Sequence, residues 1–396
     1  MHIMSKKYLI LVVFLFLVLM SFVVYKAVTK NREAAAPQTL SKFLKGIVYS
    51  PYYPGEIGGE ILPDDGRYKD HLIKIQELGA NTVSVFPEKM PSGFFDALEG
   101  TNLSYIPIIN INLYDGTDNS DLLGAAYQEK VLAHIKEIID YNYSVGRPEL
   151  LTYFVLGYEI NPAYIINTNN LHSKETSFSG KFLSLENRLP AEIALAKLLD
   201  AAMSYELERY GKRHLYAHIS FPAYGFLRSF GNSYEFDKNS FFPDFFDVIA
   251  INLYPSYFYP AEDNFIAYLE SLSKLSTKPI IISEFGLSTA PGVRDDGVPT
   301  YEDGSDRAAA KLFNMAAKQV MAISEIKGLF FFEFMDEYWK NGGEVNDDDV
   351  QNPNDSEEWF GLYSVSLEND VFVLKAKPEI NAAIKNIFKS DNSYQN

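Results

Sequence analysis

Eight short apolar runs, separated by amphipathic helical patterns, constrain the fold of this chain more than any other feature. The runs are continuous rather than alternating, which is typical of strands that are buried on both faces of a parallel sheet. Regular alternation of such strands with helices predicts an α/β fold. The predicted strands are residues 45–50, 81–86, 104–110, 152–157, 214–219, 246–252, 279–283 and 328–332.

Helical patterns lie between these strands. Val131, Ile135, Ile138 and Ile139 form one apolar stripe at helical spacing. Further helices are predicted over residues 190–210, with proline in the first turn, and over residues 306–324. Eight β/α units over roughly 290 residues fit a single (β/α)8 TIM barrel. An open, doubly wound sheet is the alternative.

The composition excludes several classes of protein. Hydrophobic residues make up 47% of the 396 residues, which is enough for a large core. Lysine and arginine number 35 against 52 aspartates and glutamates, and a net charge of −17 argues against a nucleic-acid partner. The absence of cysteine excludes disulfides and thiolate chemistry. HExxH, GxSxG and phosphate-binding glycine motifs are also absent, so we expect no metal and no cofactor.

An apolar segment without charge covers residues 8–25, between Lys7 and Lys26. Eighteen residues lie at the short end of what spans a bilayer. We expect residues 1–33 to be an uncleaved signal anchor and residues 34–43 a linker, with the body outside the cytoplasm. The alternative is a signal peptide that is cleaved near the triplet of alanines at residues 34–36, which would release a secreted protein.

A glutamate follows each of two predicted strands. Glu159 follows the fourth strand and Glu284 follows the seventh, each after at least four apolar residues. A carboxylate in such a place is costly unless it is paired or used. The fourth and seventh strands face one another across the mouth of a barrel, where active sites of this fold lie. Two carboxyl groups about 5–5.5 Å apart are what retaining glycoside hydrolysis needs.

At this point the sequence resembles a known family. The segments KPIIISEFG (278–286), INLYPSYFY (251–259) and FFFEFMDEYWK (330–340) are similar to strand ends of the glycoside hydrolase clan A superfamily of (β/α)8 retaining enzymes. The resemblance covers about residues 44–385, and the second segment resembles families 17 and 72, with family 5 also similar. It implies that Glu159 is the acid/base, Glu284 the nucleophile and Tyr254 a hydrogen-bond donor to the nucleophile.

Two positions depart from the pattern of the clan. Tyr158 stands where the clan usually has an asparagine that contacts the sugar 2-hydroxyl. The segment TVSVFPEK (82–89) lacks the arginine that the clan often carries near the end of strand two. We expect Tyr158 to change the preferred sugar, and the departures keep an inactive barrel open as an alternative.

Polar and aromatic residues at the other strand ends suit a sugar, which offers hydroxyls at its edges and C–H groups on its faces. Trp339 is the candidate stacking platform, although packing under a long loop is an equal alternative. The candidate substrate-binding residues are Tyr52, Asn110, Tyr158, Asn161, Asn252, Tyr254, Glu333 and Trp339.

We therefore expect residues 44–390 to form one glycosidase-like barrel. The expected function is membrane-anchored, retaining hydrolysis or transglycosylation of an oligo- or polysaccharide outside the cytoplasm, by a monomer. The alternative is a barrel without catalysis that binds a glycan or a protein partner. The retained pair of glutamates favours the enzyme, and Tyr158 favours the alternative.

Overall fold

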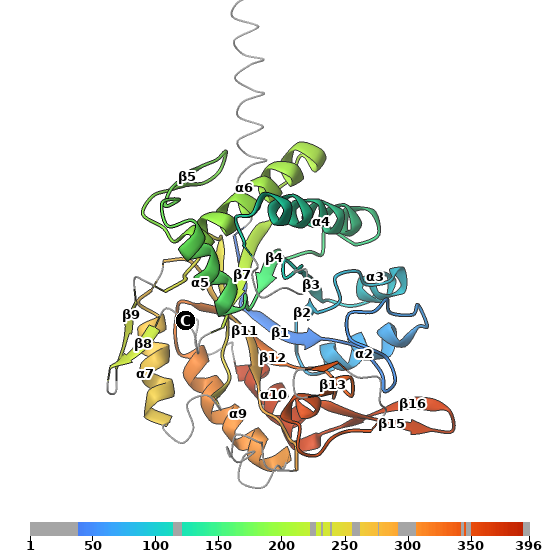
Figure 1. The fold of residues 1–396 in the computed structure, drawn as a ribbon. Helices are drawn as coiled ribbons and strands as arrows, with labels where there is room; N and C mark the ends of the chain where they lie inside the picture. Colours follow the sequence, from blue (N-terminus) through green and yellow to red (C-terminus); the bar gives the residue numbers. More distant parts are fainter. Residues whose placement is uncertain are drawn as a thin grey trace, which may run out of the picture.

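The computed structural model describes most of the body of the chain (Figure 1). The described residues are 39–113, 121–221, 227–230, 233–237, 240–255, 262–275, 277–291, 306–341, 344–345 and 350–390. The predicted membrane segment at residues 8–25 lies outside them, as do residues 256–259 of the INLYPSYFY segment. Within the described residues, no helix combines the length and the apolarity that crossing a bilayer requires.

Eight parallel strands close into a barrel. Strand β1 pairs with β2 on one side and with β12 on the other, and the order around the barrel is β1-β12-β11-β10-β7-β4-β3-β2. This closure confirms the predicted TIM barrel over an open sheet, and each predicted run contains or overlaps one strand. The strands are β1 (Leu44–Tyr49), β2 (Thr82–Val85), β3 (Ser104–Ile109), β4 (Tyr153–Tyr158), β7 (Leu215–Ser220), β10 (Val248–Asn252), β11 (Ile280–Gly286) and β12 (Ile326–Phe332).

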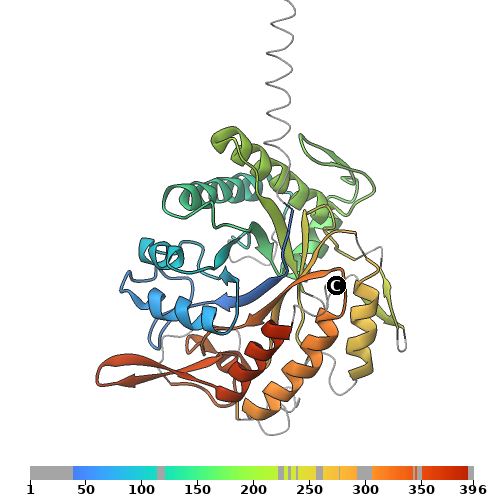
Figure 2. The ribbon, with the colours of Figure 1, turned by 180° about the vertical axis from the view of Figure 1, so that it is seen from behind.

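Helices surround the strands, as opposite views show (Figures 1 and 2). The predicted helix at 190–210 is α6, and the one at 306–324 is α9, which ends three residues earlier. The helices are α2 (Arg67–Glu77), α3 (Ser92–Glu99), α4 (Ala125–Ser144), α5 (Pro162–Leu171), α6 (Pro190–Tyr210), α7 (Glu262–Leu272), α9 (Asp306–Met321) and α10 (Pro378–Ser390).

Two-stranded β-hairpins lie outside the barrel, in the connections between its elements. Between β7 and β10 the described residues form a hairpin instead of a helix, and a long hairpin precedes α10. The hairpin strands are β5 (Phe178–Ser179) with β6 (Ser184–Leu185), β8 (Leu227–Phe230) with β9 (Ser233–Phe236), β13 (Lys340–Asn341) with β14 (Glu344–Val345), and β15 (Tyr363–Glu368) with β16 (Val371–Ala376). A 3-10 turn, η3 (Ser356–Trp359), lies in the loop after β14.

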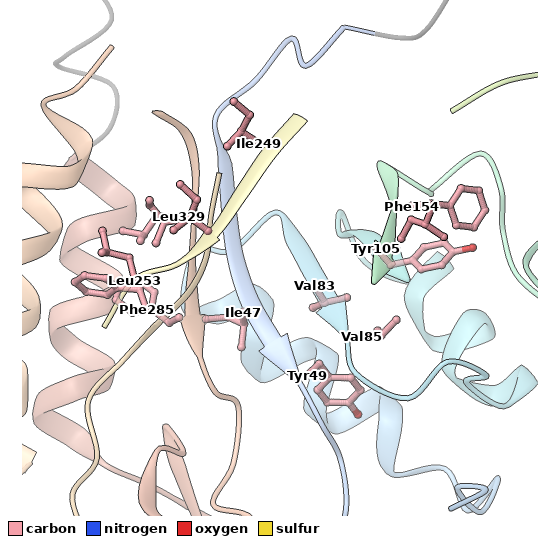
Figure 3. Packing of buried hydrophobic residues seen from close by; sticks show 14 of the residues in the cluster. Ile47, Tyr49, Val83, Val85, Tyr105, Phe154, Ile249, Leu253, Phe285 and Leu329 are labelled. Carbon is pink, nitrogen blue, oxygen red and sulfur yellow. The ribbon is translucent and has the colours of Figure 1, made fainter. Parts of the chain in front are cut away.

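Alternate side chains of each strand build two apolar layers, because successive side chains point to opposite faces of a sheet. Val48, Val155 and Phe330 belong to the cluster inside the barrel. Ile47 and Phe285 belong to the larger cluster between the strands and the helices, part of which Figure 3 shows. Both faces of each strand are thus buried, which explains why the runs are apolar throughout.

Candidate active site

The chain bends sharply where β4 ends. Gly157 has a φ of 77°, and a Cβ atom there would lie 2.4 Å from the side chain of Ile111, so only glycine fits. Glu159, two residues later, has a φ of 41°, an uncommon conformation for a residue with a side chain. Its backbone N–H donates to the carbonyl of Ile219 on β7, at 2.9 Å. This bond holds the bend and fixes Glu159 at the carboxyl end of the barrel.

Asn252, the last residue of β10, holds the side chain of Glu159. Its Nδ2 donates to Oε1 of Glu159 at 2.8 Å, and its Oδ1 accepts from the hydroxyl of Ser283 at 2.9 Å. Asn252 is fully buried, so both ends of its amide are used on protein groups. The structure therefore gives this residue, predicted to bind substrate, a contact with the candidate acid.

Glu284 lies in β11, directly beside β10. Asn252 and Glu284 are partners in the register of the two strands. The hydroxyl of Tyr254 donates to Oε2 of Glu284 at 2.5 Å, the contact that the family resemblance implies. The two glutamates thus converge on the end of β10, one held by Asn252 and the other by Tyr254.

The two carboxyl groups affect each other's ionisation. Burial and then the charge of Glu159 raise the pKa of Glu284 from 4.5 to about 8, against the hydrogen bond from Tyr254. Burial also raises the pKa of Glu159, and the hydrogen bond from Asn252 opposes that rise. Such a pair titrates as a unit. The pair therefore keeps a proton to higher pH than an isolated glutamate would.

A cluster of ionisable groups lies at the ends of β12 and β1, and sequence reasoning missed its cation. Lys340 Nζ lies 2.7 Å from Oε2 of Glu337, 3.8 Å from Oε1 of Glu333 and 3.7 Å from Oε2 of Glu357. Its charge also acts on Glu284, where it lowers the pKa. Lys340 thus supplies a positive charge that acts on Glu284, in a barrel whose second strand lacks the arginine that the family resemblance implies. The sequence pattern that could have indicated this cluster is a single lysine among four acidic residues at positions 333–344.

Glu333 and Glu337 are the two deeply buried acids of this cluster, and each is 1% exposed. Neither carboxyl oxygen of Glu333 has a hydrogen-bond partner among the described residues. Burial and then the charge of Glu337 raise the pKa of Glu333 well above its ordinary value. Glu337 accepts from the hydroxyl of Ser50 and from Nε1 of Trp339. Burial therefore favours the neutral form of Glu333.

A cavity of about 430 Å³ brings four of the predicted binding residues together. Tyr52, Asn110, Tyr158 and Trp339 all line it. The ring of Tyr158 lies 5.6 Å from that of Phe86. The Trp339 ring packs edge-on against that of Tyr52, with centroids 6.1 Å apart. This arrangement offers aromatic faces and an amide to a ligand within one cavity.

Two predicted binding residues lie elsewhere. Asn161 caps α5, because its Oδ1 accepts from the backbone N–H of Ala163 at 2.9 Å. Neither Asn161 nor Glu333 lines the cavity described above. No group of side chains within the described ranges has the composition and spacing to hold a metal ion.

The chain is similar in fold to solved structures of glycosidases. The chain is similar to a GH2 β-galacturonidase from Eisenbergiella tayi bound to galacturonate, with 15% identity and a TM-score of 0.54. It is also similar to β-glucuronidases from Dictyoglomus thermophilum (13%, TM-score 0.56) and Ruminococcus gnavus (12%, TM-score 0.57). No protein-family profile and no curated protein sequence matches the chain.

These likenesses show the fold that the chain shares with glycoside hydrolases of this type. Each covers 88% of this chain. The chain spans about half of each of these enzymes, namely 51%, 50% and 50% of their lengths. At such identities the shared feature is the barrel, and the activity has to be argued from the site.

Proposed function

We propose that this chain is a retaining glycoside hydrolase in which Glu159 is the acid/base and Glu284 the nucleophile. One observation carries the proposal: Asn252 and Tyr254, at the end of one strand, each hold one of the two glutamates through a hydrogen bond. These two hydrogen-bonded partners are neutral, and the pKa of each glutamate is raised, which favours retention of a proton by the pair.

The chemistry follows from this arrangement. Glu159 gives its proton to the glycosidic oxygen while the bond from that oxygen to the anomeric carbon breaks, and Glu284 attacks the carbon to form an ester. Glu159, now ionised, then takes a proton from water, which attacks the same carbon and releases Glu284. A sugar hydroxyl in place of water would give transglycosylation. Positive charge that develops at the sugar stabilises ionised Glu284, so the shared proton resides on Glu159 in the reacting state.

The experiment is a glycoside panel assayed with the full-length protein and with Glu284→Gln. The variant should lose at least roughly 1,000-fold in turnover, because an amide cannot attack. A 2-fluoro glycoside of the accepted sugar should label Glu284. Glu270→Gln, an exposed position on α7, is the matched control and should retain activity. Turnover by Glu284→Gln at the wild-type rate would overturn the assignment, and glycan binding without any turnover would favour the barrel without catalysis.

We further propose that residues 8–25 anchor a monomeric body to the outer side of a membrane, where it meets an oligo- or polysaccharide. Eighteen uncharged residues after two lysines support the anchor. Full-length protein should stay with membranes after a high-salt wash, which releases proteins held by charge alone. A mature N-terminus near Pro37 would instead establish cleavage.

A further inference from the structure

A second cavity, of about 470 Å³, lies beside Glu159 on the side of α5 and β7. Glu159 lines this cavity and Glu284 does not, so of the two glutamates the candidate acid is the one next to it. Aliphatic and aromatic side chains form much of its wall. These are Ile160, Ile165, Ile166, Leu189, Phe221 and Phe241.

Most of the polar side chains that line this cavity form hydrogen bonds or ion pairs with other protein groups. Burial lowers the pKa of His218 to about 4, so the ring is neutral, and its Nδ1 bonds the carbonyl of Leu156. Arg228 forms an ion pair with Asp237.

Asn169 uses its Oδ1 to accept from a backbone N–H at the start of α6. Two serine hydroxyls, from Ser220 and Ser240, complete the polar lining. Among the described residues, the cavity therefore combines apolar side chains with a few hydroxyl, amide and imidazole groups, and its one cation, Arg228, is paired with Asp237.

We infer that this cavity receives the leaving group of the substrate, and that this leaving group is an uncharged alcohol with an alkyl chain. The inference rests on the proposed function, because Glu159 protonates the oxygen between the sugar and the leaving group. That oxygen then departs as the hydroxyl of the alcohol, and water supplies the hydroxyl of the freed sugar. An alkyl chain matches the isoleucine, leucine and phenylalanine side chains of the wall, where a hydroxyl without a partner would be costly.

A different cavity suits a sugar. This cavity of about 430 Å³ is lined by Asn110, Tyr158 and Trp339, and neither Glu159 nor Glu284 lines it. In the inferred pose the alkyl chain lies over α5 and β7, and the sugar extends from the two glutamates toward β1 to β3.

The kinetic test uses methyl, butyl and hexyl glycosides of one accepted sugar with the full-length protein. These alcohols are similar leaving groups, so a rise in kcat/KM with chain length reports apolar contact. We expect about a threefold rise for each methylene that enters the cavity. In Ile166→Asp the ratio of hexyl to methyl kcat/KM should fall close to one. Ile166 is 60% exposed, so the substitution should leave the fold intact.

Ile73→Asp is the matched control, because Ile73 is an exposed isoleucine on α2, 41% exposed and away from the cavity. This variant should keep the wild-type dependence on chain length. A wild-type kcat/KM that does not change from methyl to hexyl would overturn the inference.

A binding test separates this inference from the proposed function. The uncharged fluorescent dye N-phenyl-1-naphthylamine should bind full-length Glu284→Gln protein, and adding Ile166→Asp should weaken the binding at least about tenfold. Equal dye binding with Ile166→Asp and with Ile73→Asp would overturn the apolar site. If Ile166→Asp weakens dye binding and Ile73→Asp does not, while the wild-type protein turns over no glycoside, the apolar site is supported and the proposed hydrolysis is wrong.

Discussion

Asn252 donates a hydrogen bond from its side-chain amide to Oε1 of Glu159, at 2.8 Å and across 93 residues of sequence. The same residue is the strand partner of Glu284. One buried amide therefore fixes the candidate acid relative to the strand that carries the candidate nucleophile. Ser283, the residue before that nucleophile, orients the amide by donating to its Oδ1.

Asn252→Ala should affect both the rate and its pH dependence. The hydrogen bond from Asn252 lowers the pKa of Glu159, so its loss should keep Glu159 protonated to higher pH. We expect the alkaline limb of kcat/KM to move to higher pH and the optimum rate to fall about tenfold. Ser283→Ala keeps the Asn252–Glu159 contact and should shift the limb less. An alkaline limb that does not move would contradict this role.

Tyr254→Phe should act on the opposite limb. The tyrosine hydroxyl stabilises ionised Glu284, and its removal should raise the pKa of Glu284 further. Because the nucleophile must be ionised, the acidic limb of kcat/KM should move to higher pH, and the rate at pH 6 should fall about tenfold. Tyr338→Phe removes a hydroxyl that donates to the carbonyl of Val365 instead, and it should leave the pH profile unchanged.

The sequence predicted the barrel and its two glutamates because these depend on local patterns. Each apolar run is buried on both faces, and each glutamate directly follows or ends such a run. The sequence alone could not decide the role of Asn161. An asparagine before a proline is a good helix cap as well as a candidate sugar ligand, and the structure shows the cap.

The ionic cluster at the end of β12 was not predictable in the same way. Lys340 reaches Glu333 and Glu337 only through the path of the chain after the strand. A sequence pattern carries no information about that path. The cavity beside Glu159 likewise combines residues of α5, β7, β8 and several loops, which lie up to 82 positions apart between Glu159 and Phe241.

Lys340→Met should destabilise the fold. The lysine is 17% exposed and lies among carboxylates that are 1% exposed, so its removal leaves buried negative charge without compensation. Loss of one partner of a buried ion pair costs about 3–5 kcal/mol, which denaturant unfolding can measure. Lys89→Met is the control, because Lys89 pairs with Glu137 at the surface and should cost less than about 1 kcal/mol. Equal losses would show that the cluster does not depend on its cation.

Glu284→Gln should stabilise the protein relative to wild type by an amount that grows as pH rises. In the folded protein Glu284 has a pKa of about 8, against 4.5 as its ordinary value. The unfolded chain therefore releases this proton from about pH 4.5, whereas the folded chain keeps it until about pH 8, so wild-type stability falls across this window. Glutamine has no proton to lose. The Tm difference between variant and wild type should grow from pH 5 to pH 8, and a constant difference would contradict the raised pKa.

Tyr158 is one of the two positions at which the sequence departs from the family that it resembles. Its ring packs near Phe86 and lines the sugar-side cavity, and burial and then the charge of Glu284 raise its pKa to about 12. Tyrosine places its hydroxyl farther out than asparagine would. We therefore expect a poor fit for a sugar with an equatorial 2-hydroxyl and better tolerance of a mannose-like one.

Tyr158→Asn should then shift the ratio of kcat/KM toward a gluco substrate over its manno partner by roughly fivefold, the contribution of one hydrogen bond. Tyr158→Phe keeps the packing against Phe86 and removes only the hydroxyl, so it separates packing from contact with the sugar. If Tyr158 only packs, the asparagine variant should lower the Tm and leave the gluco-to-manno ratio unchanged. That unchanged ratio would refute the role of Tyr158 in sugar selection, because a side chain that touches the 2-hydroxyl cannot be shortened without altering it.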